Sequence, residues 1–111
     1  MKIINQTNDE ILASEVRVCK SLLSKAKGLM LNLITTDQGV ILKFNKQNNF
    51  FIHGFLVPQT LDLICVREDI VVEKHTLKPF RAKRIKEKVD YILEILPGKR
   101  VEVGDKITIL S

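Results

Sequence analysis

Short apolar runs separated by polar turns cover most of the chain, and the longest run lies in its middle, from Phe50 to Val66. A membrane-spanning helix needs about 20 apolar residues without polar interruptions, whereas Pro58 and several polar side chains interrupt this run. Proline lacks an N–H group and breaks helices. We therefore predict two buried strands, Phe51–Phe55 and Leu61–Arg67, which a corner at Val57–Thr60 joins.

The flanking runs predict further strands with polar and apolar positions in alternation. In the run Val89–Leu96, for example, Asp90 and Glu94 alternate with apolar residues and are expected to point away from the core. Arg67–Asp69 is expected to form a tight hairpin turn although it lacks glycine. The other predicted strands are Lys2–Asn5, Ile11–Cys19, Gly39–Phe44, Ile70–His75, Val101–Val103 and Ile107–Leu110.

One stretch, Ser21–Leu29, has helical spacing, with apolar residues three and four positions apart. Ser21 can cap its start, and Gly28 can adopt the left-handed conformation that ends helices. One short helix among many strands predicts a mainly β fold, because parallel crossovers need helices and short turns favour antiparallel pairing. We expect a jelly-roll-like sandwich or a partly closed antiparallel barrel with one short α-helix at about residues 21–29.

Length and composition indicate one ordered domain. A chain of 111 residues with 45% apolar side chains predicts a single β-rich domain over residues 1–111. Its two cysteines, Cys19 and Cys65, lie in apolar surroundings and do not indicate a disulfide framework. The N-terminal residues lack the pattern of a signal peptide. The expected location is therefore the cytoplasm, without a membrane partner.

The net charge of +5 is concentrated in the segment from Lys78 to Lys88, and the remaining chain is close to balanced. The stretch Leu77–Lys88, which contains Pro79, is expected to be a basic connection between strands. It could bind the phosphates of RNA, with the candidate residues Arg81, Lys83, Arg84 and Lys86. Only Phe80 could stack on a base, and the simpler interpretation is a solvated loop.

Several motifs in succession resemble a known family. They include Leu61-Asp62-Leu63-Ile64, Tyr91–Gly98, Val103-Gly104-Asp105, and also Ser24–Met30, Gly39–Phe44, Phe50–Phe55 and Leu77–Arg81. Together they resemble the family catalogued as domain of unknown function 192, from about Val16 to the end of the chain. The resemblance implies a compact β-rich fold with one helix. It implies no established activity, cofactor or partner.

The central corner offers the best candidate for a ligand site. Phe51 and Phe55 could line an apolar pocket, with His53 and Asp62 as its polar groups. We therefore favour a non-catalytic module that binds a small ligand or a protein partner. If the two central strands pair, His53 could instead approach Asp62 as a general base, which would suit a small hydrolase or isomerase, and RNA binding by the basic segment is the third alternative.

The remaining reactive side chains give little evidence for a catalytic or metal site, and the sequence leaves open whether the protein is an enzyme. Cys65 lies between Ile64 and Val66 and is expected to be part of the core. The cysteines and histidines, which are Cys19, His53, Cys65 and His75, do not have the close spacing of a zinc site. We expect no metal and no cofactor, and we assign no catalytic residue.

Overall fold

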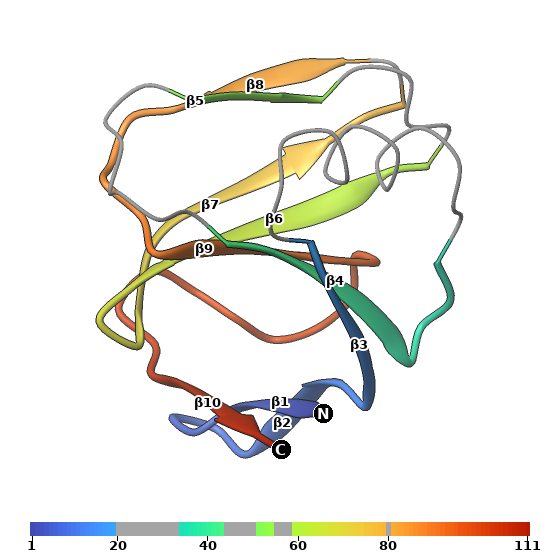
Figure 1. The fold of residues 1–111 in the computed structure, drawn as a ribbon, viewed down its shortest axis with the longest axis vertical. Helices are drawn as coiled ribbons and strands as arrows, with labels where there is room; N and C mark the ends of the chain where they lie inside the picture. The colour runs from blue at the N-terminus through green and yellow to red at the C-terminus, as the bar shows by residue number, and fades with distance from the viewer. Residues whose placement is uncertain (20–33, 44–50, 55–58, 80) are drawn as a thin grey trace.

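A computed structural model describes residues 1–19, 34–43, 51–54, 59–79 and 81–111. These residues form strands stacked in three layers, with a five-stranded sheet between two smaller ones (Figure 1). The strands are β1 Lys2–Asn5, β2 Glu10–Ala13, β3 Glu15–Cys19, β4 Gln38–Lys43, β5 Phe51–Gly54, β6 Leu61–Arg67, β7 Ile70–Leu77, β8 Ala82–Ile85, β9 Tyr91–Ile95 and β10 Ile107–Leu110. The central sheet has the order β3-β4-β9-β6-β7, the lower layer β10-β1-β2 and the upper layer β5-β8.

This arrangement confirms the mainly β prediction in its sandwich-like form, and the described sheets do not close into a barrel. The helix predicted at about residues 21–29 lies outside the described residues. One pair departs from the expected antiparallel arrangement, because β3 and β4 run parallel. A parallel pair needs a crossover connection of a dozen or more residues, and residues 20–37, which include the stretch with helical spacing, provide it.

The central sheet is covered on both faces, which explains why its inner strands β6 and β9 are buried on both sides. All five residues of β9 are buried, and β6 is buried over its first six residues. The alternation in β9 predicted an outward Glu94, and that prediction is wrong: Glu94 is 2% exposed. Its neighbours across the strands are Val40 and Leu63, which belong to the core beneath the upper layer.

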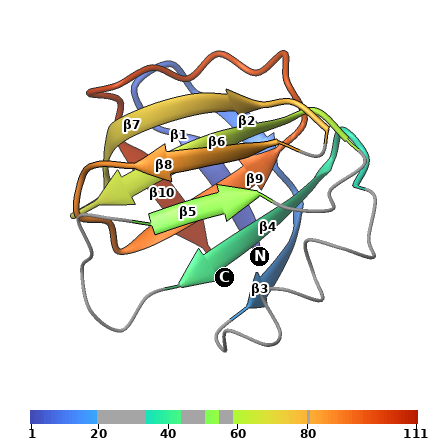
Figure 2. The ribbon, with the colours of Figure 1, turned by 90° about the horizontal axis from the view of Figure 1, so that it is seen from above.

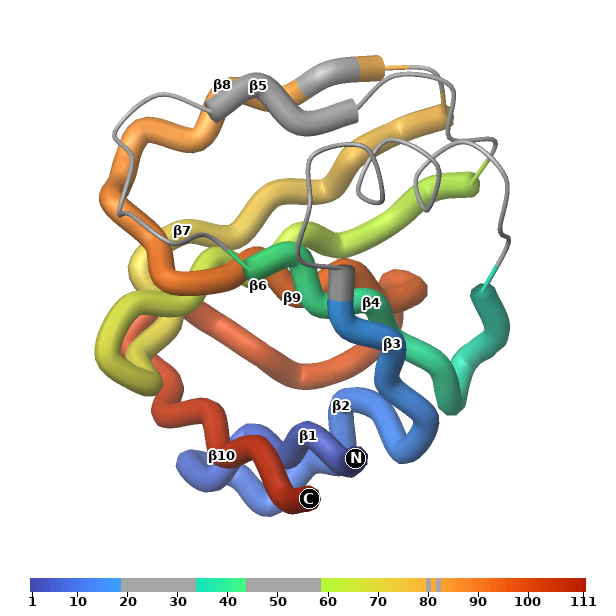
Figure 3. The backbone as a smooth tube through the Cα atoms, in the orientation of Figure 1, coloured from blue at the N-terminus to red at the C-terminus, as the bar shows by residue number. Residues whose placement is uncertain are grey.

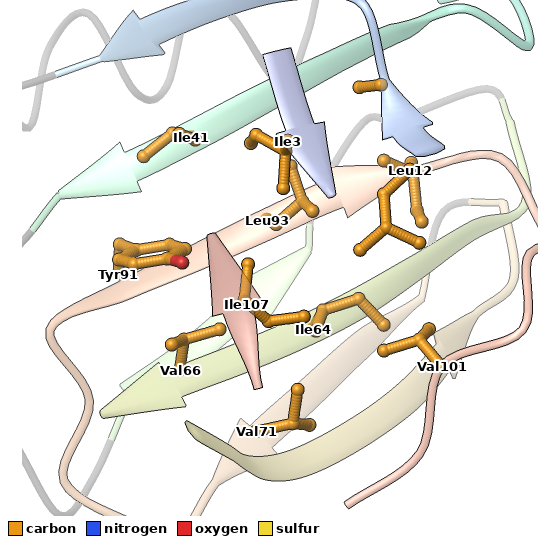
Figure 4. Packing of buried hydrophobic residues seen from close by; sticks show 12 residues of the cluster. Ile3, Leu12, Ile41, Ile64, Val66, Val71, Tyr91, Leu93, Val101 and Ile107 are labelled. Carbon is orange, nitrogen blue, oxygen red and sulfur yellow. The ribbon is translucent and has the colours of Figure 1, made fainter. Parts of the chain in front are cut away.

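The lower layer packs Ile3, Leu12 and Ile107 against the central sheet, where Ile64 and Leu93 face them (Figure 4). A polar latch closes one end of this layer. The Nδ2 group of the buried Asn5 donates hydrogen bonds to the Arg100 carbonyl at 3.0 Å and to Oδ2 of Asp105 at 2.7 Å. Both chain termini end in this layer (Figure 3).

The upper layer is a two-stranded ribbon that lies over the opposite face of the central sheet (Figure 2). Ile85 of β8 is fully buried and joins Leu63, Leu77 and Cys65 in the second core. The segment Leu77–Lys88, which the sequence predicted to be a connection, thus contains a strand. Among the described side chains of β8, Ile85 is a single buried position between charged neighbours, so the sequence shows no period of two there.

Two other strand predictions need correction. The run Ile11–Cys19 is two strands in different sheets, since the N–H groups of Ser14 and Glu15 both donate to the Asp37 carbonyl and bend the chain there. The run Val101–Val103 forms no strand. The Glu102 N–H group donates instead to Oδ2 of Asp105 at 2.8 Å, which makes a turn.

The hairpin turn predicted after β6 is confirmed, and it adopts an unusual backbone. Glu68 and Asp69 have φ angles of 52° and 66°, which is the combination of a two-residue type I′ turn. Glycine or asparagine normally occupies such positions. Here the Glu68 N–H group donates to Oδ2 of Asp90 at 2.8 Å, which helps to hold a turn that the residue types disfavour.

In the part of the chain that the structure describes, no helix is long and apolar enough to cross a membrane.

Candidate functional site

The strand pairing assumed for the central corner is not the pairing found. β5 pairs with β8, so His53 lies opposite Lys83 and Phe51 lies opposite Ile85. β6 pairs with β7 and β9, so Asp62 lies opposite Thr76 and Ile95. His53 and Asp62 therefore belong to different sheets, and the register does not bring them together. Phe55 lies outside the described residues.

Asp62 is a buried carboxylate with a defined partner on the edge strand. It is 4% exposed, and its Oδ1 atom accepts a hydrogen bond from the Thr76 hydroxyl at 2.9 Å. A buried carboxylate needs such donors, because burial without a partner would be strongly unfavourable. Asp62 therefore fixes the rotamer of Thr76, a residue at the rim of the molecule.

Thr76 and three cations surround one open hollow of about 330 Å³ where β7 ends and β8 begins. The residues that line it are Thr76, Lys78, Arg81 and Lys83. Within the described part of the chain, no carboxylate lines this hollow. Lys and Arg side chains bind phosphate and carboxylate oxygens, and Arg does so with two parallel N–H groups. The hollow is thus suited to a small anion.

The charge of the whole chain is concentrated beside this hollow. The segment from Lys78 to Lys88 holds six of the 18 basic residues and one of the 13 acidic residues, which leaves twelve of each for the rest. The entire net charge of +5 therefore belongs to eleven consecutive residues. A field of one sign at one end of a small protein attracts anions and raises their association rate.

The basic segment is anchored to the sheet, in contrast to the solvated loop that the sequence allowed. Oε2 of Glu73 on β7 accepts the backbone N–H groups of Lys86 at 2.8 Å and of Glu87 at 2.7 Å. Its Oε1 atom lies 3.0 Å from Nε2 of His75. Arg67 pairs with the Glu87 carboxylate and also donates to the Lys88 carbonyl, both at 3.3 Å.

The four candidate cations are all exposed and lie at this end of the molecule. Arg81 precedes β8, Lys83 and Arg84 lie within it, and Lys86 follows it directly. Two of them, Arg81 and Lys83, line the hollow. Among the described lining residues, Lys83 is the register partner of His53 and Thr76 is that of Asp62, while Asp62 itself does not line the hollow.

Cys65 is part of the core, as predicted. It is fully buried, and burial, with a smaller contribution from Glu73, raises its pKa to about 12. A thiol with such a pKa stays protonated at neutral pH and does not act as a nucleophile. Among the described residues, no group of three His, Cys, Asp or Glu side chains could hold a metal ion.

Two other hollows are less suited to binding an anion. One of about 390 Å³ runs along β3 and β4, and both Glu15 and Arg17 line it. Another of about 360 Å³ lies beside Lys74 and Lys99, but Glu102 and Asp105 line it as well. Mixed charge makes the latter less selective for an anion than the hollow at the start of β8.

Sequence reasoning missed two residues of this region, namely Glu73 and Thr76, whereas Lys78 lies in the basic segment that it proposed for phosphate binding. Thr76 carries no signal of its own, since only the register of β6 and β7 places it opposite Asp62. Glu73 lies in a strand predicted correctly, and its function as an anchor depends on β8, which the sequence did not reveal.

Comparisons with known proteins agree with this fold. The sequence pattern of DUF192, described as an uncharacterized ACR family, matches residues 3–109. The UPF0127 protein PH1112 of Pyrococcus horikoshii is 32% identical over 110 residues, which cover 95% of this chain and 96% of that protein. The UPF0127 protein PYRAB11210 of Pyrococcus abyssi is 33% identical, with 95% and 94% covered.

Two crystal structures have a similar fold at low sequence identity. A protein of unknown function from Novosphingobium aromaticivorans superposes with a TM-score of 0.78 at 18% identity, covering 97% of this chain and 82% of that one. A Sinorhizobium meliloti protein, provisionally described as a transcription regulator, gives 0.76 at 17% identity, with 96% and 89% covered. These likenesses concern the fold alone.

Proposed function

The chain belongs to the DUF192 family, which is described as uncharacterized, and from its geometry we propose that it is a non-catalytic module that binds a small anionic ligand. The observation that carries this proposal is the hollow at the start of β8, where Lys78, Arg81 and Lys83 converge without a carboxylate among the described lining residues. The Thr76 hydroxyl also lines this hollow, but its hydrogen is donated to Asp62. We place the module in the cytoplasm, where a free thiol such as Cys65 stays reduced.

A non-catalytic module is the better choice because the described residues around the hollow offer binding groups but no general base. Asp62 already accepts the Thr76 hydroxyl, and the pairing that would have joined Asp62 to His53 is not formed. Lysine and arginine hold anions by charge and hydrogen bonds. The hydrolase or isomerase alternative would need a group that moves a proton at the hollow, and the described histidine–carboxylate pair, His75 and Glu73 at 3.0 Å, does not line it.

The test uses pyrophosphate as the probe and amide NMR shifts as the readout. On titration at low salt we expect saturable shifts confined to residues 76–85, with a dissociation constant below about 1 mM. The double variant Arg81→Gln/Lys83→Gln should weaken binding at least tenfold. The matched control Lys2→Gln/Lys106→Gln removes equal charge in the lower layer and should leave binding unchanged.

The same titration can overturn the proposal. Shifts spread evenly over all cations, or equal losses in the two double variants, would mean that pyrophosphate senses only net charge. Thermal unfolding of each variant shows that it is folded before binding is compared. Native mass spectrometry of freshly purified protein identifies an anion that has co-purified, and a neutral apolar ligand there would contradict the proposal directly.

A further inference from the structure

We infer that the anion held in this hollow continues along β8 as an extended chain of phosphates, such as single-stranded RNA or linear polyphosphate. This inference rests on the proposed function, because the hollow supplies the first contact. Cations continue beyond the hollow at Arg84, Lys86 and Lys88, all of them exposed. A ligand confined to the hollow would use only Lys78, Arg81 and Lys83.

The spacing of these cations suits an extended ligand. Residues of a strand advance about 3.3 Å each, so Lys83, Lys86 and Lys88 cover at most about 17 Å of chain. This reach is several times the size of one phosphate group. A chain of phosphates that begins in the hollow could therefore meet a new cation at each of two or three further positions.

The backbone beyond β8 is fixed, which favours binding. Glu73 accepts the N–H groups of Lys86 and Glu87, and Arg67 donates to the Lys88 carbonyl. Cations on a fixed backbone lose less conformational entropy on binding than cations on a mobile loop. The anchors thus fix the backbone at Lys86 and Lys88, which follow β8 where the chain turns toward β9 (Figure 1), before any ligand arrives.

The acidic groups near this line are occupied. Glu87 is the one carboxylate within the basic segment, and it pairs with Arg67 at 3.3 Å. Both oxygens of Glu73 are engaged, one by the two backbone N–H groups and one by His75. Glu87 is thus paired with a cation, whereas Glu73 keeps its negative charge but directs its oxygens at the backbone of the segment and at His75.

The test measures fluorescence anisotropy of a labelled twelve-residue oligouridine over a range of salt concentrations. The informative variant is Lys86→Gln/Lys88→Gln, which leaves the hollow intact. We expect it to weaken oligouridine binding about tenfold and to leave pyrophosphate binding unchanged. For single strands each phosphate contact contributes about 0.7 to the slope of log affinity against log salt, so the loss of two contacts should lower the slope by about 1.4.

Each outcome decides between named alternatives. Unchanged oligouridine binding in Lys86→Gln/Lys88→Gln would overturn the extended chain while the small-anion function stands. Failure of pyrophosphate to bind wild-type protein would overturn the proposed function, and this inference with it. Linear polyphosphate of equal charge, added as competitor, identifies the source of the phosphates. Equal competition by polyglutamate would show that any polyanion binds, which contradicts a phosphate-selective line.

Discussion

The two faces of the central sheet differ in how their covering layers are attached and in what they expose. The lower layer is a three-stranded sheet that buries Ile3, Leu12 and Ile107, and its two segments, residues 1–13 and 98–111, hold four basic and four acidic residues. The upper layer is a two-stranded ribbon that buries Ile85 and carries the whole net charge beside it. We interpret the lower side as the stabilising one and the upper side as the binding one.

The two covering layers differ in size although both bury apolar residues of the same central strands. Strands covered on both faces are mostly apolar, as the buried residues of β6 and β9 are apart from Asp62 and Glu94. A two-stranded ribbon opens at a lower free energy than a broader layer with more strands. Binding residues are usually drawn from such regions, and the basic hollow lies on this side of the molecule.

The largest expected effect concerns the latch of the lower layer. Asn5→Ala removes the hydrogen bonds to the Arg100 carbonyl and Asp105 and leaves the Thr7 N–H group without its 3.1 Å acceptor. We expect the free energy of unfolding to fall by about 2–4 kcal/mol, since buried groups lose their partners. Urea denaturation measures this loss.

Asn8→Ala is the matched control, because Asn8 also donates to the Arg100 carbonyl, at 3.0 Å, from a more exposed position. Its loss should stay below about 1 kcal/mol. If the two variants were equally stable, the latch would not hold the lower layer, and the contrast between the two sides would fail.

The second prediction tests whether the core under the upper layer excludes water as well as the core under the lower layer does. Burial raises the pKa of Cys65 from 9 to about 12. Because the folded pKa is the higher one, the protonated thiol stabilises the fold fully below pH 9, and this contribution is lost as the pH rises toward 12. Between pH 8 and 10.5 the loss is about 2 kcal/mol.

The measurement compares urea denaturation of wild type and Cys65→Val at these two pH values. Valine is close in size and does not ionise, so the variant should lose less stability on the alkaline side. An identical pH dependence of the two proteins would mean that water reaches the thiol. The upper ribbon would then cover its core less tightly than the structure indicates.

The accuracy of the sequence-based prediction differs from strand to strand, because the residue pattern marks some strands clearly and others not at all. Strands with a run of apolar residues, such as β6 and β4, were predicted almost to the residue, because burial on both faces leaves a continuous pattern. β8 was missed because four of its neighbouring positions are charged and one buried residue, Ile85, does not make a pattern. The outward prediction for Glu94 failed because no local signal reveals a second covering layer.

The candidate site was predicted in parts and not as a whole. The sequence indicated both Asp62 and the basic residues as candidates. The pairing of β5 with β6 that it allowed would not have placed Asp62 near the basic residues. Which strands pair depends on contacts distant in the chain, and short-range periodicity does not contain that information. The register of β5 with β8 and of β6 with β7 places Lys83 opposite His53 and Thr76 opposite Asp62, and Lys83 and Thr76 line one hollow.

The third prediction tests the anchor of the upper layer. Glu73→Gln keeps one side-chain oxygen but loses the negative charge that the N–H groups of Lys86 and Glu87 bind at 2.8 and 2.7 Å. We expect about 1 kcal/mol less protection, seen as about fivefold faster hydrogen exchange at these two amides. Amides of β9 should be unaffected.

Glu87→Gln is the control, since it removes only the exposed pair with Arg67. Exposed ion pairs contribute less than about 1 kcal/mol, so the same two amides should keep their exchange rates. Faster exchange throughout the molecule in Glu73→Gln would show that the ribbon opens only with the whole fold. That result would remove the distinction between a stable lower side and a less stable upper side.

The smallest effect concerns an imperfection on the lower side of the central sheet. Tyr91 is 7% exposed, and its hydroxyl has no hydrogen-bond partner among the described residues. Burial, followed by the nearby Asp69 and Asp90 carboxylates, raises its pKa. Tyr91→Phe removes this unsatisfied group and keeps the ring, so the free energy of unfolding should rise by up to about 1 kcal/mol.

Thermal and urea denaturation at pH 7 measure this gain, and Tyr91→Leu serves as the control because it removes the ring, which should cost about 1–3 kcal/mol. A loss of stability in Tyr91→Phe would mean that the hydroxyl is bonded, for example to a buried water. The lower core would then owe part of its stability to a polar contact, as the upper layer does through Glu73. The lower and upper sides would then differ less in the type of contact that stabilises them than their net charges and numbers of strands indicate.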